Sequence, residues 1–268
     1  MRLTEAQRKQ YERDGYVLLP SLLSEAEVTQ LRDEVARLSR LDGEGIFRES
    51  DCGPVKLMAR VHEPDGITAS PPFRTLSQSP RVLGIAQDVL GNDALYIHHT
   101  KVNFKEAVHG SVWPWHQDYG QWRLDGIQAP DMTTVMIMLD DASEIGGCLY
   151  FLPGSHMLGR KEPYWNDTTG YNLHALPAED VTAALAELGE PVAVAGKAGD
   201  AAVFHCNLFH ASGHNLSPKS RCQAYFCFNT VANRPHNVPE PRPDYIRSTN
   251  WTPLALGPDE PLRAMESA

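Results

Sequence analysis

The chain is poor in cysteine and has no paired cysteine motif. Its five cysteines stand at positions 52, 148, 206, 222 and 227, without any Cys-x-x-Cys spacing. Such a set indicates reduced thiols, not a disulfide framework. The chain also has no run of 18 apolar residues, and its polar N-terminal stretch is unlike a secretory signal. We therefore expect a cytoplasmic protein that does not cross a membrane.

Positive charge is also scarce. The chain has 24 lysines and arginines against 34 aspartates and glutamates, which gives a formal net charge of −10. This balance disfavours nucleic acid or an anionic membrane surface as the main partner. The length of 268 residues suffices to bury a large core. We expect a globular monomer or homodimer that acts on a small molecule.

Helical patterns dominate the first third of the chain. Thr4 precedes a short helical stretch that Gly15 ends, and the pair Ser24 and Glu27 forms a capping box. Apolar residues at helical spacing follow this box. The patterns predict helices over 4–14, 24–40 and 79–90, and loop with short strands over 42–75.

Strand patterns dominate from residue 94 to about residue 230. Alternating or continuous apolar runs predict strands over 94–104, 133–139, 201–210 and 221–229. A polar loop is expected over 157–177 and a short helix over 177–189. The sequence therefore predicts one mainly β domain with flanking α-helices over 1–268. Its parts are a helical region of about 1–92, a β core of about 94–230 and a C-terminal tail of 231–268.

His116 and Asp118 stand two residues apart among aromatic side chains. On an extended strand, residues i and i+2 point the same way, so both side chains can converge on one point. A neutral imidazole and a carboxylate are two of the three ligands that hold non-heme Fe(II). Taken alone the pair is a weak signal, because a strand-end histidine that donates to a nearby carbonyl gives the same pattern.

Several other histidines compete for the third ligand position. His205 is expected to be a hydrogen-bonded core residue, and His62 and His214 are expected at the surface. His210 ends a strand, and Arg221 follows on the next one. This arrangement suits a metal site beside an anionic co-substrate, because a guanidinium holds a carboxylate bidentately.

Four ordered motifs together carry a resemblance to a known family. They are His116-x-Asp118, Gly146-Gly147 with Pro153–His156, Gly199-Asp200 leading to His210–Ser212, and Arg221. In this order they resemble the phytanoyl-CoA dioxygenase family, and within it the branch of ectoine and free amino-acid hydroxylases. The opening of the chain also looks like that family, so the similarity covers about residues 3–255.

The resemblance implies a double-stranded β-helix core, also called a jelly roll or cupin-like fold. It implies Fe(II) bound by His116, Asp118 and His210, with 2-oxoglutarate and O2 as co-substrates. Arg221 would hold the distal carboxylate of 2-oxoglutarate. Further co-substrate contacts would come from Ser212, Asn103, His99 and Thr134.

The resemblance also implies substrate contacts. Trp122 matches a residue that walls the pocket, and Arg242 matches an arginine that meets a substrate carboxylate. Further candidates are Phe204, Cys206, Gln223 and Tyr225, although Phe204 and Tyr225 fit ordinary core filling equally well. The segment after Asp118 departs from ectoine hydroxylases, so we do not expect ectoine as the substrate.

The implied reaction is hydroxylation of an unactivated C–H bond, with release of succinate and CO2. It requires no catalytic acid or base beyond the metal centre. Desaturation or cyclisation of an intermediate in natural-product biosynthesis uses the same co-substrates and stays open. A non-catalytic jelly-roll binding protein would have no need of every ligand, and a zinc hydrolase would leave Arg221 unexplained.

Overall fold

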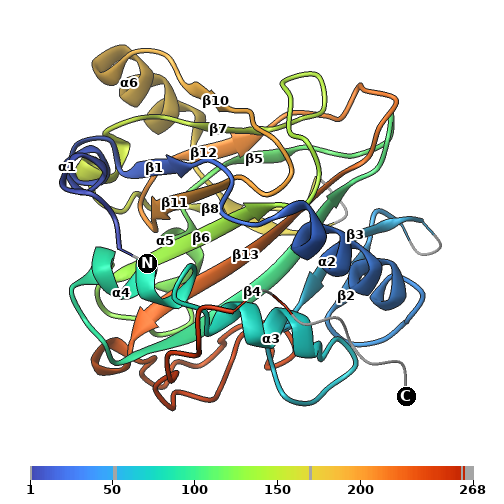
Figure 1. Ribbon diagram of the computed structural model, residues 1–268. Coiled ribbons are helices and arrows are strands. Elements are labelled where there is room, and N and C mark those ends of the chain that lie inside the picture. The colour runs from blue at the N-terminus through green and yellow to red at the C-terminus, as the bar shows by residue number, and fades with distance from the viewer. Residues whose placement is uncertain (1, 51–52, 169–170, 261, 263–268) are drawn as a thin grey trace, which may run out of the picture.

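The computed structural model describes residues 2–50, 53–168, 171–260 and 262, and its centre is a pair of β-sheets (Figure 1). The larger sheet has seven strands in the order β1 (Tyr16–Leu19), β11 (Ala201–His205), β6 (Met132–Met138), β13 (Arg221–Thr230), β4 (Leu95–Lys105), β3 (Val55–Ala59) and β2 (Ile46–Arg48). The smaller has the order β10 (Val192–Val194), β7 (Leu149–Phe151), β12 (His210–Ser212) and β5 (Trp113–His116). The pairings between these strands are antiparallel.

The two sheets face each other across a buried apolar layer. Met136 and Tyr225 of the larger sheet share one cluster with Leu149, Phe151 and Val194 of the smaller. Two sheets with interdigitating inner faces make a β-sandwich core. The predicted double-stranded β-helix core is thus confirmed.

Four helices cover the outer face of the larger sheet. They are α1 (Glu5–Asp14), α2 (Glu25–Leu38), α3 (Pro71–Ser77) and α4 (Leu83–Leu90). Their apolar side chains share a single cluster with strand residues such as Val135, Val203 and Phe226. The expected capping box is present, because Glu27 N–H donates to the Ser24 hydroxyl while Ser24 N–H donates to the Glu27 carboxylate.

Shorter elements complete the smaller sheet and its surroundings. The helix α6 (Ala178–Leu188) packs Val181 and Ala184 against Leu152 and Phe209, beside the smaller sheet. The remaining elements are α5 (Asp118–Trp122), the paired strands β8 (Tyr164–Asn166) and β9 (Leu173–Ala175), and the 3-10 helices η1 (Ser155–Leu158) and η2 (Val231–Asn233).

The structure corrects the sequence prediction in four segments. The strand expected over 201–210 is two strands in different sheets, β11 and β12, separated by a turn after His205. The segment expected as loop over 42–75 contains the start of α3, where Ser70 accepts from Phe73 N–H and prolines occupy the first turn. The helix expected from residue 79 begins at Leu83, because Ser79 and the following residues form a turn. The polar loop expected over 157–177 contains the hairpin β8–β9.

His62 was predicted at the surface and is instead buried. Its Nδ1 lies 2.8 Å from the Thr100 hydroxyl, which fixes the ring under β4. His214 is exposed, as expected. His205 accepts from Asn207 N–H at 3.0 Å, so its predicted hydrogen bond is confirmed, but it is half-buried and not the core residue that we expected.

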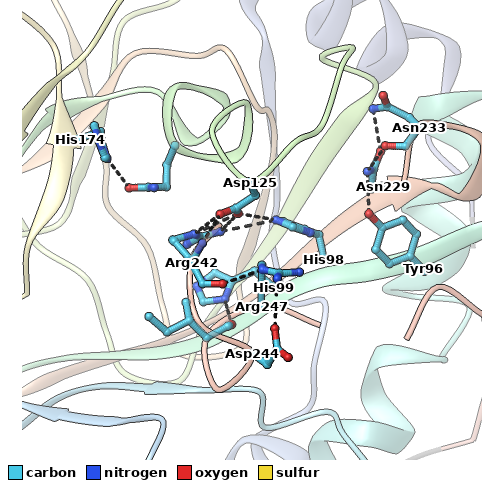
Figure 2. A network of polar contacts seen from close by, with 12 residues as sticks. Tyr96, His98, His99, Asp125, His174, Asn229, Asn233, Arg242, Asp244 and Arg247 are labelled. Carbon is cyan, nitrogen blue, oxygen red and sulfur yellow. Dashed lines mark hydrogen bonds and ion pairs between the residues drawn. The ribbon is translucent and has the colours of Figure 1, made fainter. Parts of the chain in front are cut away.

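The C-terminal tail runs beside β4. Ser248 N–H donates to His98 O at 2.8 Å, and Leu254 N–H donates to Leu95 O at 2.8 Å. In Figure 2, Arg242 and Arg247 of the segment before Ser248 lie beside His98 and His99 of β4. Among the described residues, no helix is both long and apolar enough to span a bilayer. Four of the five cysteines are free thiols, and Cys52 lies outside the described residues.

Candidate metal centre and active site

Three predicted metal ligands meet at one end of the smaller sheet. His116 ends β5 and lies directly opposite His210, the first residue of β12, with ring centroids 4.0 Å apart. Asp118 Oδ1 lies 4.0 Å from His210 Nε2. One ligand atom from each of the three residues lies within 4.8 Å of the other two, and all three side chains are buried. The sequence-predicted triad is therefore assembled.

The local geometry of the His-x-Asp pair differs from the extended strand that we expected. β5 ends at His116, Gln117 has extended dihedrals (φ −113°, ψ 133°), and Asp118 is the first residue of α5. One extended residue between the two ligands is sufficient to aim both side chains at the same point. The helix that follows then turns the chain away from the metal site.

Both imidazoles present an unprotonated nitrogen to the site. His116 Nδ1 lies 2.7 Å from Pro114 O, and His210 Nδ1 lies 2.9 Å from Leu208 O. A carbonyl only accepts, so each Nδ1 carries the proton and each Nε2 keeps its lone pair. Burial lowers the pKa of both rings, well below the usual range for His116, and keeps them neutral.

Asp118 supplies the negative charge of the triad. Burial acts to raise its pKa, but the Lys101 ammonium and the neighbouring imidazoles outweigh burial and lower the pKa to about 2. The Thr134 hydroxyl lies 3.5 Å from Asp118 Oδ2. Thr134, predicted to contact the co-substrate, is thus placed against a metal ligand. Two neutral imidazoles and one carboxylate are the donor set of the non-heme Fe(II) facial triad.

Arg221 is the first residue of β13 and has unpartnered polar atoms around it. Its guanidinium donates to Gly147 O at 2.6 Å and to the Gln223 side-chain oxygen. Within the part of the chain that the structure describes, four buried polar atoms near this guanidinium have no hydrogen-bond partner: Arg221 Nε, Gln223 Nε2, Asn103 Oδ1 and Ser212 Oγ. Buried polar groups are almost always hydrogen-bonded, so such a group of orphans indicates a missing polar ligand. Arg221 Nε, Gln223 Nε2 and Ser212 Oγ can donate, so they fit a carboxylate of a ligand such as 2-oxoglutarate, whereas Asn103 Oδ1 can only accept.

Two facing rows of side chains line this region, one on β4 and one on β13. The register pairs Arg221 with Lys105, Gln223 with Asn103, Tyr225 with Lys101, and Cys227 with His99. The sequence predicted five of these eight positions as site residues and missed Lys101, Lys105 and Cys227. The alternation that turns His99 and Asn103 inward also turns these two lysines inward, so the pattern contained the signal.

The pKa values of the two lysines are shifted in opposite directions. Burial, followed by the neighbouring Arg221 and Lys56 cations, lowers the pKa of Lys105 to about 6. Burial also acts to lower the pKa of Lys101, but the Asp118 carboxylate outweighs this effect and leaves the pKa raised. The Lys101 ammonium accordingly lies 3.7 Å from Asp118 Oδ1, beside the predicted metal ligands.

The predicted substrate residues fall into two groups. Phe204 lies beside the metal ligands, with its ring centroid 5.3 Å from that of His210. Trp122 and Cys206 are fully buried in an apolar cluster behind the site, where Cys206 Sγ donates to Pro130 O at 3.2 Å. Gln223 and Tyr225 lie at the Arg221 side, where the Tyr225 hydroxyl donates to Gln223 Oε1 at 2.8 Å.

Arg242 and His99 connect the tail to the site (Figure 2). The Arg242 guanidinium forms an ion pair with Asp125 at 2.6 Å, and His99 Nδ1 lies 2.6 Å from Ile246 O. Burial and the nearby Arg242 cation keep the pKa of His99 well below its usual range. His99 Nδ1 is thus the protonated nitrogen, and the ring is anchored by the tail.

A cavity of about 260 Å³ opens beside Arg242. Its wall includes three aromatic residues, Phe47, Trp165 and Tyr171, together with Gln121, Arg242 and Ile246. Most of these positions lie in segments that sequence reasoning took for loops, so their part in the site had no periodic signal. The Tyr171 ring lies 5.3 Å from that of Trp113, which in turn contacts Lys101. This chain of contacts leads from the cavity to the metal centre.

Comparison with known proteins agrees with this geometry. The chain is 32% identical to an ectoine dioxygenase of Nocardia farcinica over 258 residues, which cover 91% of this chain and 85% of that protein. It is 32% identical to an L-proline trans-4-hydroxylase of Streptomyces griseoviridis over 256 residues, covering 91% and 92%. The crystal structure of EctD from S. alaskensis with 2-oxoglutarate and 5-hydroxyectoine matches with a TM-score of 0.81 at 28% identity, covering 95% of this chain and 86% of that one. The family model for phytanoyl-CoA dioxygenase (PhyH) matches residues 11–222, and the chain belongs to this family.

Proposed function

We propose that this protein is an Fe(II)- and 2-oxoglutarate-dependent dioxygenase that hydroxylates a small, carboxylated, amino-acid-like metabolite. The observation that carries the proposal is the assembled triad, with two Nε2 lone pairs and one carboxylate within 4.8 Å of one another. Three orphaned polar atoms around Arg221 support the second half of the proposal, since Arg221 Nε, Gln223 Nε2 and Ser212 Oγ can all donate to a carboxylate.

The bound iron, with 2-oxoglutarate and O2, would supply the oxidation: one oxygen atom enters a substrate C–H bond and the other enters succinate, with loss of CO2. His116, Asp118 and His210 would hold the metal. Arg221 would fix the distal carboxylate through its guanidinium fork, while the Ser212 hydroxyl and the side-chain NH2 group of Asn103 would donate to other co-substrate oxygens. None of these residues has to transfer a proton.

The remaining residues of the site would orient the substrate and exclude water. Phe204 and Phe151 pack beside His210, with ring centroids 5.3 and 6.3 Å from the imidazole. The aromatic cavity next to Arg242 offers space for a small metabolite. The relatives named as ectoine dioxygenase and L-proline trans-4-hydroxylase support a compact substrate that carries a carboxylate.

One domain would carry the whole activity, since a single apolar cluster includes both Leu3 and Leu262. The four free cysteines support a reducing compartment such as the cytoplasm.

The direct test is co-substrate turnover. The protein is loaded with Fe(II) without oxygen, then mixed with 2-oxoglutarate, O2 and a panel of free amino acids that includes L-proline. Succinate and a product heavier by one oxygen atom should form in equal amounts. Asp118→Ala should abolish both, whereas Asp141→Ala, at an exposed surface ion pair, should change neither. Hydrolysis supported by Zn(II), with no consumption of 2-oxoglutarate, would overturn the proposal.

A further inference from the structure

The two oxygens of the Asp118 carboxylate face different groups. Oδ1 lies 3.7 Å from Lys101 Nζ and 4.0 Å from His210 Nε2, and both distances exceed the length of a hydrogen bond. Oδ2 lies 3.5 Å from the hydroxyl of Thr134. An ionised carboxylate only accepts, so the Thr134 hydroxyl is the donor in this pair. The protein therefore holds one oxygen of the carboxylate and leaves the other on the side of the His210 imidazole.

The Thr134 hydroxyl is itself held in place. Thr134 is fully buried on β6, and a β-branched side chain has few rotamers. The register places it opposite Cys227 of β13, with Thr134 Oγ1 3.5 Å from Cys227 Sγ. Burial raises the pKa of the Cys227 thiol to about 12, so the thiol keeps its proton and can donate to Thr134 Oγ1. The single hydroxyl proton of Thr134 is then left for Asp118 Oδ2.

Apolar side chains adjoin this pair of hydrogen bonds. Cys227 shares a buried cluster with Tyr119, the residue after Asp118, and with Trp122. A carboxylate oxygen that loses water on burial is costly unless a donor replaces that water. Thr134 has no exposed surface, so it supplies this donor from within the protein.

The number of oxygens that Asp118 offers decides how much of a metal stays open. A carboxylate binds a metal through one oxygen or through both. Two imidazoles and a single carboxylate oxygen leave three positions of a six-coordinate ion free, whereas a two-oxygen carboxylate leaves only two. The proposed function needs these free positions for 2-oxoglutarate and O2. A hydrogen bond that occupies Oδ2 favours the arrangement with more room.

We propose that Thr134 is a positioning residue that keeps Asp118 a single-oxygen ligand by holding Oδ2, with the Cys227 thiol orienting the Thr134 hydroxyl. This inference rests on the proposed function. It gives Thr134 a role that differs from the co-substrate contact implied by the resemblance. Without the hydroxyl, the Asp118 carboxylate can turn and present both oxygens to the metal.

The test counts the water molecules on a bound metal. Mn(II) takes the place of Fe(II), because it speeds the relaxation of water protons in proportion to the exchangeable waters that it carries. Thr134→Val replaces the hydroxyl with a methyl group, and Thr134→Ser restores a hydroxyl. Thr133→Val is the matched control, since Thr133 is a buried threonine on the same strand whose hydroxyl donates to Phe204 O at 3.0 Å. The thermal midpoint and the affinities for Mn(II) and 2-oxoglutarate are measured for each variant.

Thr134→Val should still bind Mn(II), but the water relaxation per bound Mn(II) should fall by about a third, as expected when three free positions become two. Its affinity for 2-oxoglutarate should fall at least about tenfold. Thr134→Ser should match the wild type in both measurements. Thr133→Val should have a lower thermal midpoint and unchanged water relaxation, which separates the proposed role from a loss of stability.

Equal water relaxation in the wild type and Thr134→Val would overturn the assignment, as would an equal fall in Thr133→Val. A Thr134→Val variant that binds no Mn(II) would also overturn it, because the hydroxyl would then be needed for binding itself. If Thr134→Val does not fold, Cys227→Ala takes its place and should lower the relaxation in part, and an unchanged value would contradict the proposal. A wild type that binds Mn(II) but no 2-oxoglutarate would overturn the proposed function, whatever the water count of the variants.

Discussion

Arg242 donates to both carboxylate oxygens of Asp125, with N–O distances between 2.6 and 3.1 Å. The Asp125 carboxylate also lies 2.9 Å from His98 Nε2, so it joins the tail to β4 and to the loop after α5 (Figure 2). Burial acts to raise the pKa of Asp125, but Arg242 and His98 hold it well below its usual range. The arginine that the resemblance assigns to a substrate carboxylate is thus already neutralised by the protein.

Removal of the Asp125 charge should destabilise the fold. Asp125 is buried and Arg242 is nearly so, and a buried cation that loses its partner costs about 3–5 kcal/mol. We expect Asp125→Asn to lower the free energy of unfolding by this amount in urea denaturation at pH 7. Asp141→Asn is the control, because its partner Lys197 is exposed, and it should cost less than about 1 kcal/mol.

A small loss for Asp125→Asn, similar to that of the control, would show that water or His98 replaces the ion pair. In that case Arg242 would be free to turn toward the cavity beside it.

Metal removal should lower the thermal midpoint. The three ligands come from β5, α5 and β12, and a ligand that binds only the folded state adds stability by mass action. At a free metal concentration of about 100 times the dissociation constant this is about 2.7 kcal/mol. A chelator should therefore lower the midpoint in scanning calorimetry, and added Fe(II) under nitrogen should restore it. His210→Ala should show a midpoint that responds to neither addition. An equal response in that variant would place the metal elsewhere.

Acid should destabilise the protein in part through His62. Burial lowers the pKa of His62 to about 4, whereas the unfolded chain titrates near 6.5. Between these values the unfolded state binds a proton that the folded state does not, so stability is lost as pH falls from about 6.5 to about 4. The loss from this residue is at most about 3 kcal/mol.

His62→Gln should remove this slope while it leaves a constant offset from the lost bond to Thr100. Urea denaturation of the chelated protein at several pH values measures the slope without a metal contribution. His214→Gln, at an exposed position, is the control. Parallel curves for the wild type and His62→Gln would contradict the prediction.

The sequence predicted the elements whose pattern is local. The capping box at Ser24 depends on neighbours a few residues away, and it appears as expected. The strand expected over 201–210 is instead two strands, because a turn after His205 separates β11 from β12. His62 was misplaced because its burial depends on Thr100, which is distant in sequence. The start of α4 was misplaced because a turn at Ser79 imitates a cap.

The residues of the site differ in how well the sequence alone predicted them. His116, Asp118, His210 and Arg221 were found through motif order, which the fold preserves. The pairing of Arg242 with Asp125 joins residues 117 positions apart, and no spacing rule predicts it. Lys101 is the intermediate case, since strand alternation indicated its direction but its nearness to Asp118 required the sheet register.

Gly147 connects backbone geometry to the co-substrate site. It has a left-handed φ of +68°, and a Cβ there would lie 2.7 Å from Gly213 O and 2.9 Å from His214 O. Its own carbonyl accepts from the Arg221 guanidinium at 2.6 Å. Gly147→Ala must therefore shift the backbone that orients Arg221, and we expect a loss of about 1–3 kcal/mol in the free energy of unfolding.

The same substitution should weaken 2-oxoglutarate several-fold in calorimetry, because Arg221 loses the acceptor that fixes its fork. Gly66→Ala is the control for backbone strain alone. Gly66 also has a positive φ (+98°), but a Cβ there would meet no other atom within 4 Å. That control should lose some stability from the backbone conformation alone and should bind 2-oxoglutarate like the wild type. If both variants bind the co-substrate equally well, Gly147 has a role in folding only, and the orientation of Arg221 depends on Gln223.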